Sequence, residues 1–368
     1  MKEESNDIKE NSIVNYNGQE KNRIIYYDVL RILAIFFVVV LHVSSANWYK
    51  TDVNTYNWFM MNFYDSISRW CNPILVMISG SLFLNREIEV KVLYKKYIFR
   101  IATALIFWSF VYSFFYTVIG KKEGLTTFIV VFIKGYFHLW FLYMIIGLYM
   151  ITPFLKKIIK DEKLTKYFII LASIFTLIIP EIISIIQEFS PEYAEALESA
   201  VDNSYMKFVC GFTVYYILGY FLSSRTLSKK QYHIIYILGI VGFLSTIILS
   251  LIISKKHNEA IATFYSSMTL NVALEAICIF TLGKNLISKK IAISNKTSEI
   301  IGKLSKYSFG AYLIHALIQI FLDKVLGIHS LLFNPLFSIP VVAIIIYIAS
   351  FCISAILHQI PVVKKYLV

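Results

Sequence analysis

The chain has 368 residues, of which 58% are hydrophobic and only 16% are charged. A soluble domain usually carries about a quarter charged residues, and no soluble fold of this length could bury so much apolar surface, so lipid must solvate part of the chain. The net charge of +12 does not indicate a nucleic-acid binder, because the basic residues stand in short clusters between apolar runs rather than on one face.

The apolar runs predict an all-α polytopic membrane bundle of about ten transmembrane helices. A helix needs about 20 predominantly apolar residues to cross the hydrocarbon core. The polar stretch before the first run is too long for a signal peptide, so we expect an uncleaved first helix. Residues 1–22 form a polar tail and residues 23–368 a single membrane domain. The expected spans are 27–46, 67–84, 98–119, 138–155, 167–186, 207–223, 233–253, 266–284, 307–326 and 335–358.

The basic residues predict the orientation of this bundle. Of the 35 lysines and arginines, 26 fall on the N-terminal side, in alternate connections, or at the C-terminus, and nine fall in the other connections. Cytoplasmic loops carry such an excess. We therefore expect both termini in the cytoplasm of a bacterial cell. The connections expected there are 85–100, 156–166, 224–232 and 284–306.

Two shorter segments complete the expected organisation. Residues 128–133 are apolar but too short to span, which is typical of an interfacial segment. The longest outer connection, about 187–206, is acidic, and Ser190 before Pro191 has the pattern of a helix cap with proline at the first helical position. A short amphipathic helix on the outer face is expected there.

The four cysteines lie in or beside apolar stretches and form no CxxC pair. This argues against a disulfide framework and against a zinc site, and we expect no metal. The cysteines are expected to be small buried hydrophobes. They are Cys71, Cys210, Cys278 and Cys352.

The first expected span carries two ionisable side chains on one helix face. Arg31 and His42 are eleven positions apart, which makes three turns plus roughly 20° and a separation of roughly 16 Å along the axis. With Arg31 at the cytoplasmic mouth, His42 lies beyond the bilayer centre, and both are expected to face one cavity, since an ionisable group at membrane depth usually has a task. Asp28, three residues before Arg31, is expected to orient it.

This pair predicts a division of labour. Arg31 is expected to hold an anionic cofactor, and His42 to take a proton from a hydroxyl group. The alternatives are a snorkelling anchor for Arg31 and a helix-to-helix hydrogen bond for His42.

Other polar residues are candidates for supporting or substrate-binding roles. Glu275 is expected to be the only carboxylate at mid-membrane depth, where it must be neutral or paired, and it either orients the site or is a structural partner. Arg69 is either an interfacial anchor or a cation for the acceptor. His315 lies in the middle of the ninth span. Trp140 follows His138 at an interface, where aromatic-belt anchoring alone would explain a tryptophan.

The second span is expected to be broken. Asn72-Pro73 and Ser79-Gly80 interrupt its apolar run. Broken membrane helices often line a cavity, which makes Ser79 a candidate for substrate binding. Tight packing of small residues is the alternative.

Four stretches resemble one family. The run RIIYYDVLRILAIFFVVVLHV is similar to the first helix of the membrane-bound acyltransferase type 3 family, whose mark is Arg or Lys, ten residues, then His. The stretches NPILVMISGSLFL, HLWFLYMIIGLYMITPFL and YSFGAYLIHALI resemble its second, fourth and ninth helices, in that order. Within the family, the chain looks like the branch containing the O-acetyltransferase of enterobacterial common antigen.

The resemblance implies an O-acetyltransferase that takes acetyl-CoA from the cytoplasm and modifies a glycan or a lipid-linked sugar. It implies that His42 is the catalytic histidine and Arg31 its basic partner, and that Ser79, Trp140 and His315 belong to further motifs. A transporter of a small polar solute or polysaccharide remains the alternative, because some relatives are thought to move serine. Two observations disfavour a transporter: the sequence shows no internal repeat, which many transporter folds have, and it shows no second buried acid for a coupling relay.

Overall fold

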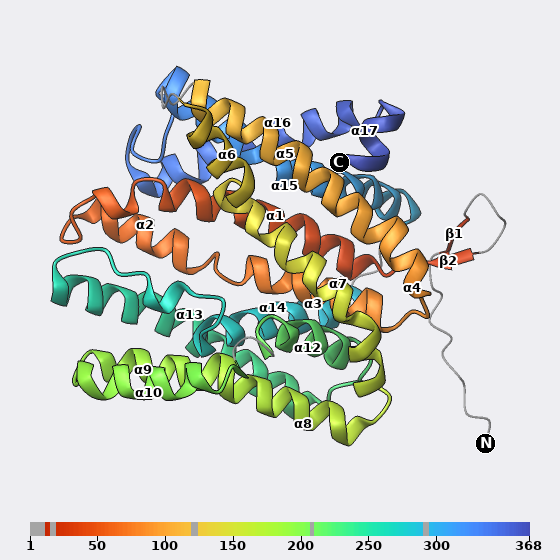
Figure 1. Cartoon of the computed structure of the whole chain (residues 1–368), viewed down its shortest axis with the longest axis horizontal. Helices are drawn as coiled ribbons and strands as arrows, with labels where there is room; N and C mark the ends of the chain where they lie inside the picture. The colour runs from red at the N-terminus through yellow and green to blue at the C-terminus, as the bar shows by residue number, and fades with distance from the viewer. Residues whose placement is uncertain (1–11, 15–19, 119–123, 207–209, 290–293) are drawn as a thin grey trace.

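The computed structural model describes residues 12–14, 20–118, 124–206, 210–289 and 294–368. Nine helical segments in this part are long and apolar enough to cross a membrane, so the prediction of an all-α polytopic bundle is confirmed (Figure 1). Ahead of the first helix, strands β1 Ser12–Val14 and β2 Glu20–Asn22 form a small antiparallel ribbon.

The helices follow the chain in the order in which the spans were predicted. The α-helices are α1 Ile25–Ser45, α2 Tyr56–Ser66, α3 Cys71–Leu84, α4 Val90–Val92, α5 Phe99–Val118, α6 Leu125–Lys134, α7 Trp140–Ile158, α8 Glu162–Ser173, α9 Ile179–Gln187, α10 Pro191–Asn203, α12 Thr213–Ser223, α13 Lys229–His257, α14 Leu270–Lys289, α15 Asn295–Leu326, α16 Pro335–Leu357 and α17 Pro361–Tyr366. Short 3₁₀ turns are η1 Trp48–Lys50, η3 Phe137–Leu139 and η5 Thr263–Tyr265, and π-helical turns are η2 Leu93–Ile98 and η4 Ile174–Ile178.

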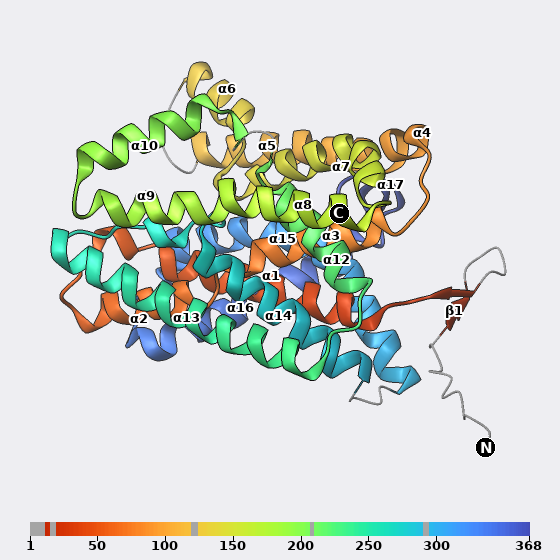
Figure 2. The ribbon, with the colours of Figure 1, turned by 90° about the horizontal axis from the view of Figure 1, so that it is seen from below.

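In the part of the chain that the structure describes, connections from the two predicted sets lie at opposite ends of the bundle. The N-terminal ribbon, α4 and the α7–α8 connection are at one end, which we call the basic end (Figure 1). The α1–α2, α9–α10 and α13–α14 connections are at the other end, which we call the far end. Figure 2 shows the same separation from below. The alternation read from the basic residues therefore agrees with the course of the chain.

The second span begins earlier than predicted. It comprises α2 and α3, joined by a turn at residues 67–70, and runs from Tyr56 to Leu84 rather than from residue 67. Asn72 and Pro73 do not break it, because Pro73 stands in the first turn of α3, where its missing N–H leaves no hydrogen bond unmade. The polar side chains of α2 lowered its hydropathy and concealed it.

The sixth predicted span, 207–223, is shorter than expected in its described part. Helix α12 has 11 residues, too few to cross a bilayer alone, and it is buried against α3; residues 207–209 lie outside the described part of the chain. The two helices touch through their glycines. A Cβ atom on Gly80 would lie 1.8 Å from the carbonyl oxygen of Tyr216, and one on Gly219 would lie 2.0 Å from that of Met77. Tight packing is thus confirmed for Gly80.

Three smaller predictions have mixed outcomes. Helix α10 begins at Pro191 as expected, but the Ser190 side chain makes no capping hydrogen bond. The apolar segment near 128–133 forms the separate short helix α6. Cys71, Cys210 and Cys278 are buried as predicted, whereas Cys352 is exposed on α16, so for Cys352 the prediction is wrong.

Candidate active site in two cavities

Helix α1 is anchored to α15 at its start. The Asp28 carboxylate accepts a hydrogen bond from Ser305 Oγ (2.5 Å) and forms an ion pair with Arg31 Nη1 (3.5 Å). Arg23 also pairs with Asp28 and donates to the main-chain oxygen of Gly302 (2.9 Å). Arg31 in turn donates to Ser305 Oγ (2.9 Å). Asp28 therefore contacts Arg31 as expected, and the pair fixes the position of α1 against α15.

Arg31 lines a cavity of about 330 Å³, which we call the Arg31 cavity. Three arginines border it: Arg31 on α1, Arg86 after α3 and Arg100 on α5. Ser79 lines it too, while its hydroxyl donates to the main-chain oxygen of Leu75 (2.9 Å). Apart from Ser308, the remaining wall is aromatic and aliphatic, with Ile35, Leu75, Leu82, Phe83, Ile88, Tyr97, Ile101, Phe141, Leu142, Ile145, Tyr149, Phe309 and Tyr312.

The Arg31 cavity has the composition of a site for an elongated anion. A guanidinium binds phosphate oxygens through a planar fork of donors, and an apolar wall holds the uncharged part of a ligand. The sequence identified only one of its three arginines as a candidate. Arg86 and Arg100 had been counted as topology signals, and no spacing rule relates them to Arg31.

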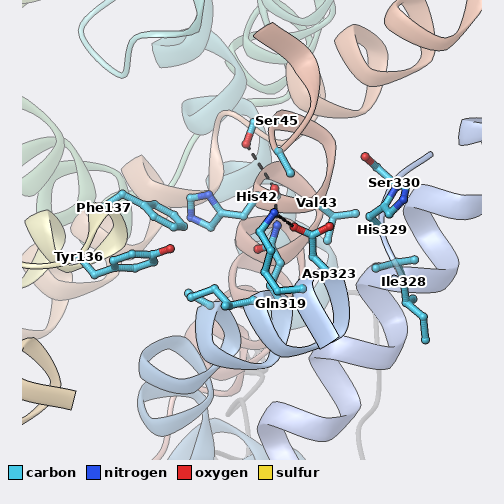
Figure 3. Close-up of a pocket in the computed structure, with 15 residues that line it drawn as sticks. His42, Val43, Ser45, Tyr136, Phe137, Gln319, Asp323, Ile328, His329 and Ser330 are labelled. Carbon is cyan, nitrogen blue, oxygen red and sulfur yellow. Dashed lines mark hydrogen bonds and ion pairs between the residues drawn. The ribbon is translucent and has the colours of Figure 1, made fainter. Parts of the chain in front are cut away.

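His42 lines a second cavity of about 320 Å³, the His42 cavity, toward the far end of α1. Figure 3 shows its imidazole pointing toward Phe137 and Tyr136, with Gln319 and Asp323 bordering the cavity on another side. The Gln319 amide donates to the main-chain oxygen of His42 (2.8 Å). The other lining residues are Val43, Ser45, Ala46, Ala316, Ile320, Lys324, Ile328, His329, Ser330 and Val342.

Arg31 and His42 therefore do not line one cavity, and that prediction is wrong. Helix α15 provides the wall between the two cavities. Tyr312 lines the Arg31 cavity, and its ring lies 5.7 Å from that of His315. The His315 ring stacks on His42, with 5.3 Å between centroids and 16° between planes. Helical spacing places Arg31 and His42 on one face, but rings from the neighbouring helix fill the space between them.

A third imidazole joins this wall. The ring of His138 lies 5.0 Å from that of His315, and both side chains are buried. Because a carbonyl oxygen only accepts, His315 Nδ1 carries the proton that it donates to the Tyr312 main chain (2.5 Å). His315 Nε2 and both nitrogens of His138 have no hydrogen-bond partner among the described residues. Polar groups buried in this way are costly, which is typical of a functional site.

Trp140 lies outside both cavities as the structure describes them. It is 37% exposed and packs against Phe212, with 5.4 Å between ring centroids. The segment around it reaches the site through other residues, since Phe141 lines the Arg31 cavity and His138 joins the wall. The substrate-binding role expected for Trp140 has no support in this geometry.

Arg69 is partly buried and forms an ion pair that the sequence did not predict. Its guanidinium lies 2.5 Å from the carboxylate of Asp65, which is fully buried, and 4.0 Å above the ring of Tyr265. Glu275 was expected to be the only carboxylate at mid-membrane depth. This expectation is wrong, because Asp65 is also buried within a span, Tyr56–Leu84. The second span had been placed too late in the chain to include it. Among the cavities in the described residues, Arg69 lines neither of the two above.

Arg69→Ala is therefore expected to destabilise the protein rather than to weaken acceptor binding selectively. Leaving one member of a buried ion pair unpaired costs about 3–5 kcal/mol. The thermal stability of the purified protein should fall clearly, and the apolar double variant Asp65→Leu/Arg69→Met should recover most of it. If Arg69→Ala instead leaves the stability unchanged and raises the KM for the acceptor, Arg69 binds the acceptor.

Glu275 also belongs to a structural network. It is fully buried on α14, where its Oε1 accepts a hydrogen bond from Thr246 on α13 (2.5 Å). Asn271 donates to the same Thr246 hydroxyl (2.8 Å). Within the described part of the chain, no contact joins Glu275 to Arg31 or His42, so it does not orient that pair. It ties α13 to α14 instead.

The family model described as an acyltransferase domain matches residues 24–359. The chain belongs to the acyltransferase 3 family. No curated protein and no solved structure matches it. Family membership and the nine apolar helical segments together identify a membrane acyltransferase.

In this acyltransferase, the four stretches that carry the family resemblance meet at the two cavities. Helix α1 contributes Arg31 and His42, and α3 contributes Ser79. Phe141 comes from α7, and Tyr312 from α15. Stretches far apart in the sequence therefore surround one region of the bundle. Within the described residues, no group of three or more His, Cys, Asp or Glu side chains is arranged to hold a metal ion.

Proposed function

We propose that the protein is an O-acetyltransferase of the bacterial cell membrane, with both termini in the cytoplasm. It takes the acetyl group from acetyl-CoA and transfers it to a hydroxyl of a cell-envelope glycan or lipid-linked sugar. The observation that carries this proposal is the pair of cavities on α1, one with three arginines toward the basic end and one containing His42. The enterobacterial common antigen branch is the relationship that we propose within the family.

The donor occupies the Arg31 cavity. Arg31, Arg86 and Arg100 bind its phosphates, and the aromatic and aliphatic wall holds the pantetheine arm. Tyr312 closes the end of this cavity that is nearest to His315. Transfer then requires Tyr312 to turn aside, so that the thioester reaches the imidazole. The Tyr312 ring is buried and its hydroxyl donates to the main-chain oxygen of His138, so this movement also breaks that hydrogen bond.

The acceptor hydroxyl occupies the His42 cavity. Polar side chains there, among them Ser45, Gln319 and His329, offer hydrogen bonds to a sugar. His42 acts as general base on the hydroxyl, whose oxygen forms the ester bond to the acetyl carbon as the carbon–sulfur bond breaks. His42 passes the proton to the departing thiolate. Stacking against His315 holds the imidazole in place.

Purified protein in lipid vesicles, given acetyl-labelled acetyl-CoA, tests the proposal. Labelled acetate or a labelled acceptor is expected, and neither should form without the protein. Solute flux across the vesicle membrane in the absence of a donor would instead support a transporter. The buried acid Asp65 removes one sequence argument against transport, but neither Asp65 nor Glu275 lines either cavity within the described residues.

Arg31→Ala is expected to raise the KM for acetyl-CoA roughly 10- to 100-fold with a small effect on kcat, because a charge-assisted hydrogen bond to phosphate contributes about 1.5–3 kcal/mol. Initial rates over a range of donor concentrations measure this. The matched control is Arg225→Ala, which removes an arginine that pairs with Glu162 (2.7 Å) and stacks on Phe221. Unchanged donor affinity in Arg31→Ala would make Arg31 a structural anchor only.

A further inference from the structure

A third cavity, at the basic end, has an unusual concentration of cations. This groove has a volume of about 670 Å³ and lies between the segment from η2 to the start of α5 and the end of the chain around α17. Five lysines and arginines line it, and no acidic side chain is among its lining residues. Its cations are Lys95, Lys96, Arg100, Lys364 and Lys365, and we call it the basic groove.

The α17 wall of the basic groove is held in place by main-chain contacts. Arg100 donates to the main-chain oxygen of Val368 (2.6 Å), and Trp108 Nε1 donates to that of Leu367 (2.9 Å). Thr103 Oγ1 donates to the main-chain oxygen of Tyr366 (3.0 Å). The Val368 side chain is fully buried. Helix α17 therefore presents Lys364 and Lys365 from a fixed position.

The basic groove adjoins the Arg31 cavity. Tyr97 and Arg100 line both, so one ligand can place a charged end in the groove and extend an uncharged arm past these two residues. The groove also contains the rings of Phe99 and Tyr366, which pack edge to face with 6.0 Å between their centroids, and aromatic side chains of this kind can stack on a flat heterocycle. Several phosphates joined to a heterocycle and to a long uncharged arm match this arrangement in charge and in shape.

We propose that the basic groove binds the nucleotide end of the acyl donor, with its 3′-phosphate beside Lys364 and Lys365 of α17, while its diphosphate stays with Arg31, Arg86 and Arg100. This inference rests on the proposed transfer from a CoA thioester. Like-charged side chains repel one another unless an anion lies between them, so the five cations favour a multiply charged ligand. An anionic phospholipid headgroup has the same chemistry, and the experiment distinguishes the two sources.

The test is equilibrium binding to the full chain in phosphatidylcholine nanodiscs. CoA, dephospho-CoA and pantetheine are titrated against the wild type and against Lys364→Ala/Lys365→Ala. The double variant is expected to bind CoA about tenfold more weakly, dephospho-CoA less so, and pantetheine unchanged, because two exposed cations each contribute modestly to phosphate binding. The matched control is Lys229→Ala/Lys230→Ala, which removes two exposed lysines at the start of α13, outside the groove.

Each outcome decides the proposal. Equal CoA affinity in the wild type and in the Lys364→Ala/Lys365→Ala variant would overturn the groove assignment and leave the proposed acyl transfer standing. A wild type that binds no CoA would overturn both. If phosphatidylglycerol in the nanodiscs binds through Lys364 and Lys365 and displaces CoA at low mole fraction, the basic groove is a lipid site and the donor assignment falls.

Discussion

Replacing His42 by alanine is expected to abolish acyl transfer while the protein keeps its fold. A general base contributes about 10²- to 10⁴-fold to the rate, and His42 lines the His42 cavity while its ring stacks on His315 in the wall between the two cavities. Donor binding should stay near normal, because the donor site that we propose is the Arg31 cavity and not the His42 cavity. Transfer rates and CoA affinity of the same preparation measure both effects.

The controls separate chemistry from folding. His42→Gln keeps a polar side chain of similar size but lacks a group that takes a proton, so it should be nearly as inactive as His42→Ala. His233→Ala removes an exposed histidine on α13 that bonds only its own helix, through the main-chain oxygen of Lys229, and it should retain full activity. If His42→Ala still transfers acetyl groups at a substantial rate, or if it loses donor binding, His42 is not the general base.

Hydropathy predicted the bundle because lipid imposes one requirement on every span. A membrane helix must present about 20 apolar residues, and the longer spans do. Hydropathy failed to predict the bounds of helices that are surrounded by other helices rather than by lipid. Asn62 and Asp65 on α2 are fully buried, and the short helix α12 packs against α3. Neither condition is visible in a window of sequence.

The candidate site could be predicted only as far as one helix extends. Arg31, Asp28 and His42 follow from spacing on α1, and the contact between Asp28 and Arg31 was found where it was expected. The separation of Arg31 from His42 depends on side chains from α15, namely Tyr312 and His315, which no spacing on α1 reports. Contacts between helices are a property of the assembled bundle.

Ionisable residues in the membrane were predicted to have a task, and this rule did not separate catalytic from structural roles. Glu275 is fully buried and Arg69 is partly buried, yet their partners are Thr246 and Asp65, and neither residue lines the Arg31 cavity or the His42 cavity. The pairing of Asp65 with Arg69 at i and i+4 was available in the sequence. A second span that begins at residue 67 excludes Asp65, so this pairing falls outside the span predicted from hydropathy.

Gly80→Ala is expected to be among the most destabilising single substitutions in the bundle. The added Cβ would lie 1.8 Å from the Tyr216 carbonyl oxygen and 2.6 Å from its carbon, both main-chain atoms of α12. A main chain cannot turn aside as a flexible side chain does, so α3 and α12 must separate. Overpacking of this kind costs about 3 kcal/mol. The yield of monodisperse protein and its apparent melting temperature measure the effect.

Gly147→Ala is the matched control, since nothing lies within 4 Å of a Cβ placed on that glycine in α7. It should leave stability unchanged or raise it slightly, because alanine is the better helix former. Gly219→Ala should repeat the loss from the opposite side of the contact, where the Cβ would lie 2.0 Å from the Met77 carbonyl oxygen. Because Ser79, the neighbour of Gly80 in the sequence, lines the Arg31 cavity, a separation of α3 from α12 also displaces one wall of the proposed donor site. Preserved melting temperature in Gly80→Ala would mean that the two helices do not touch through their main chains.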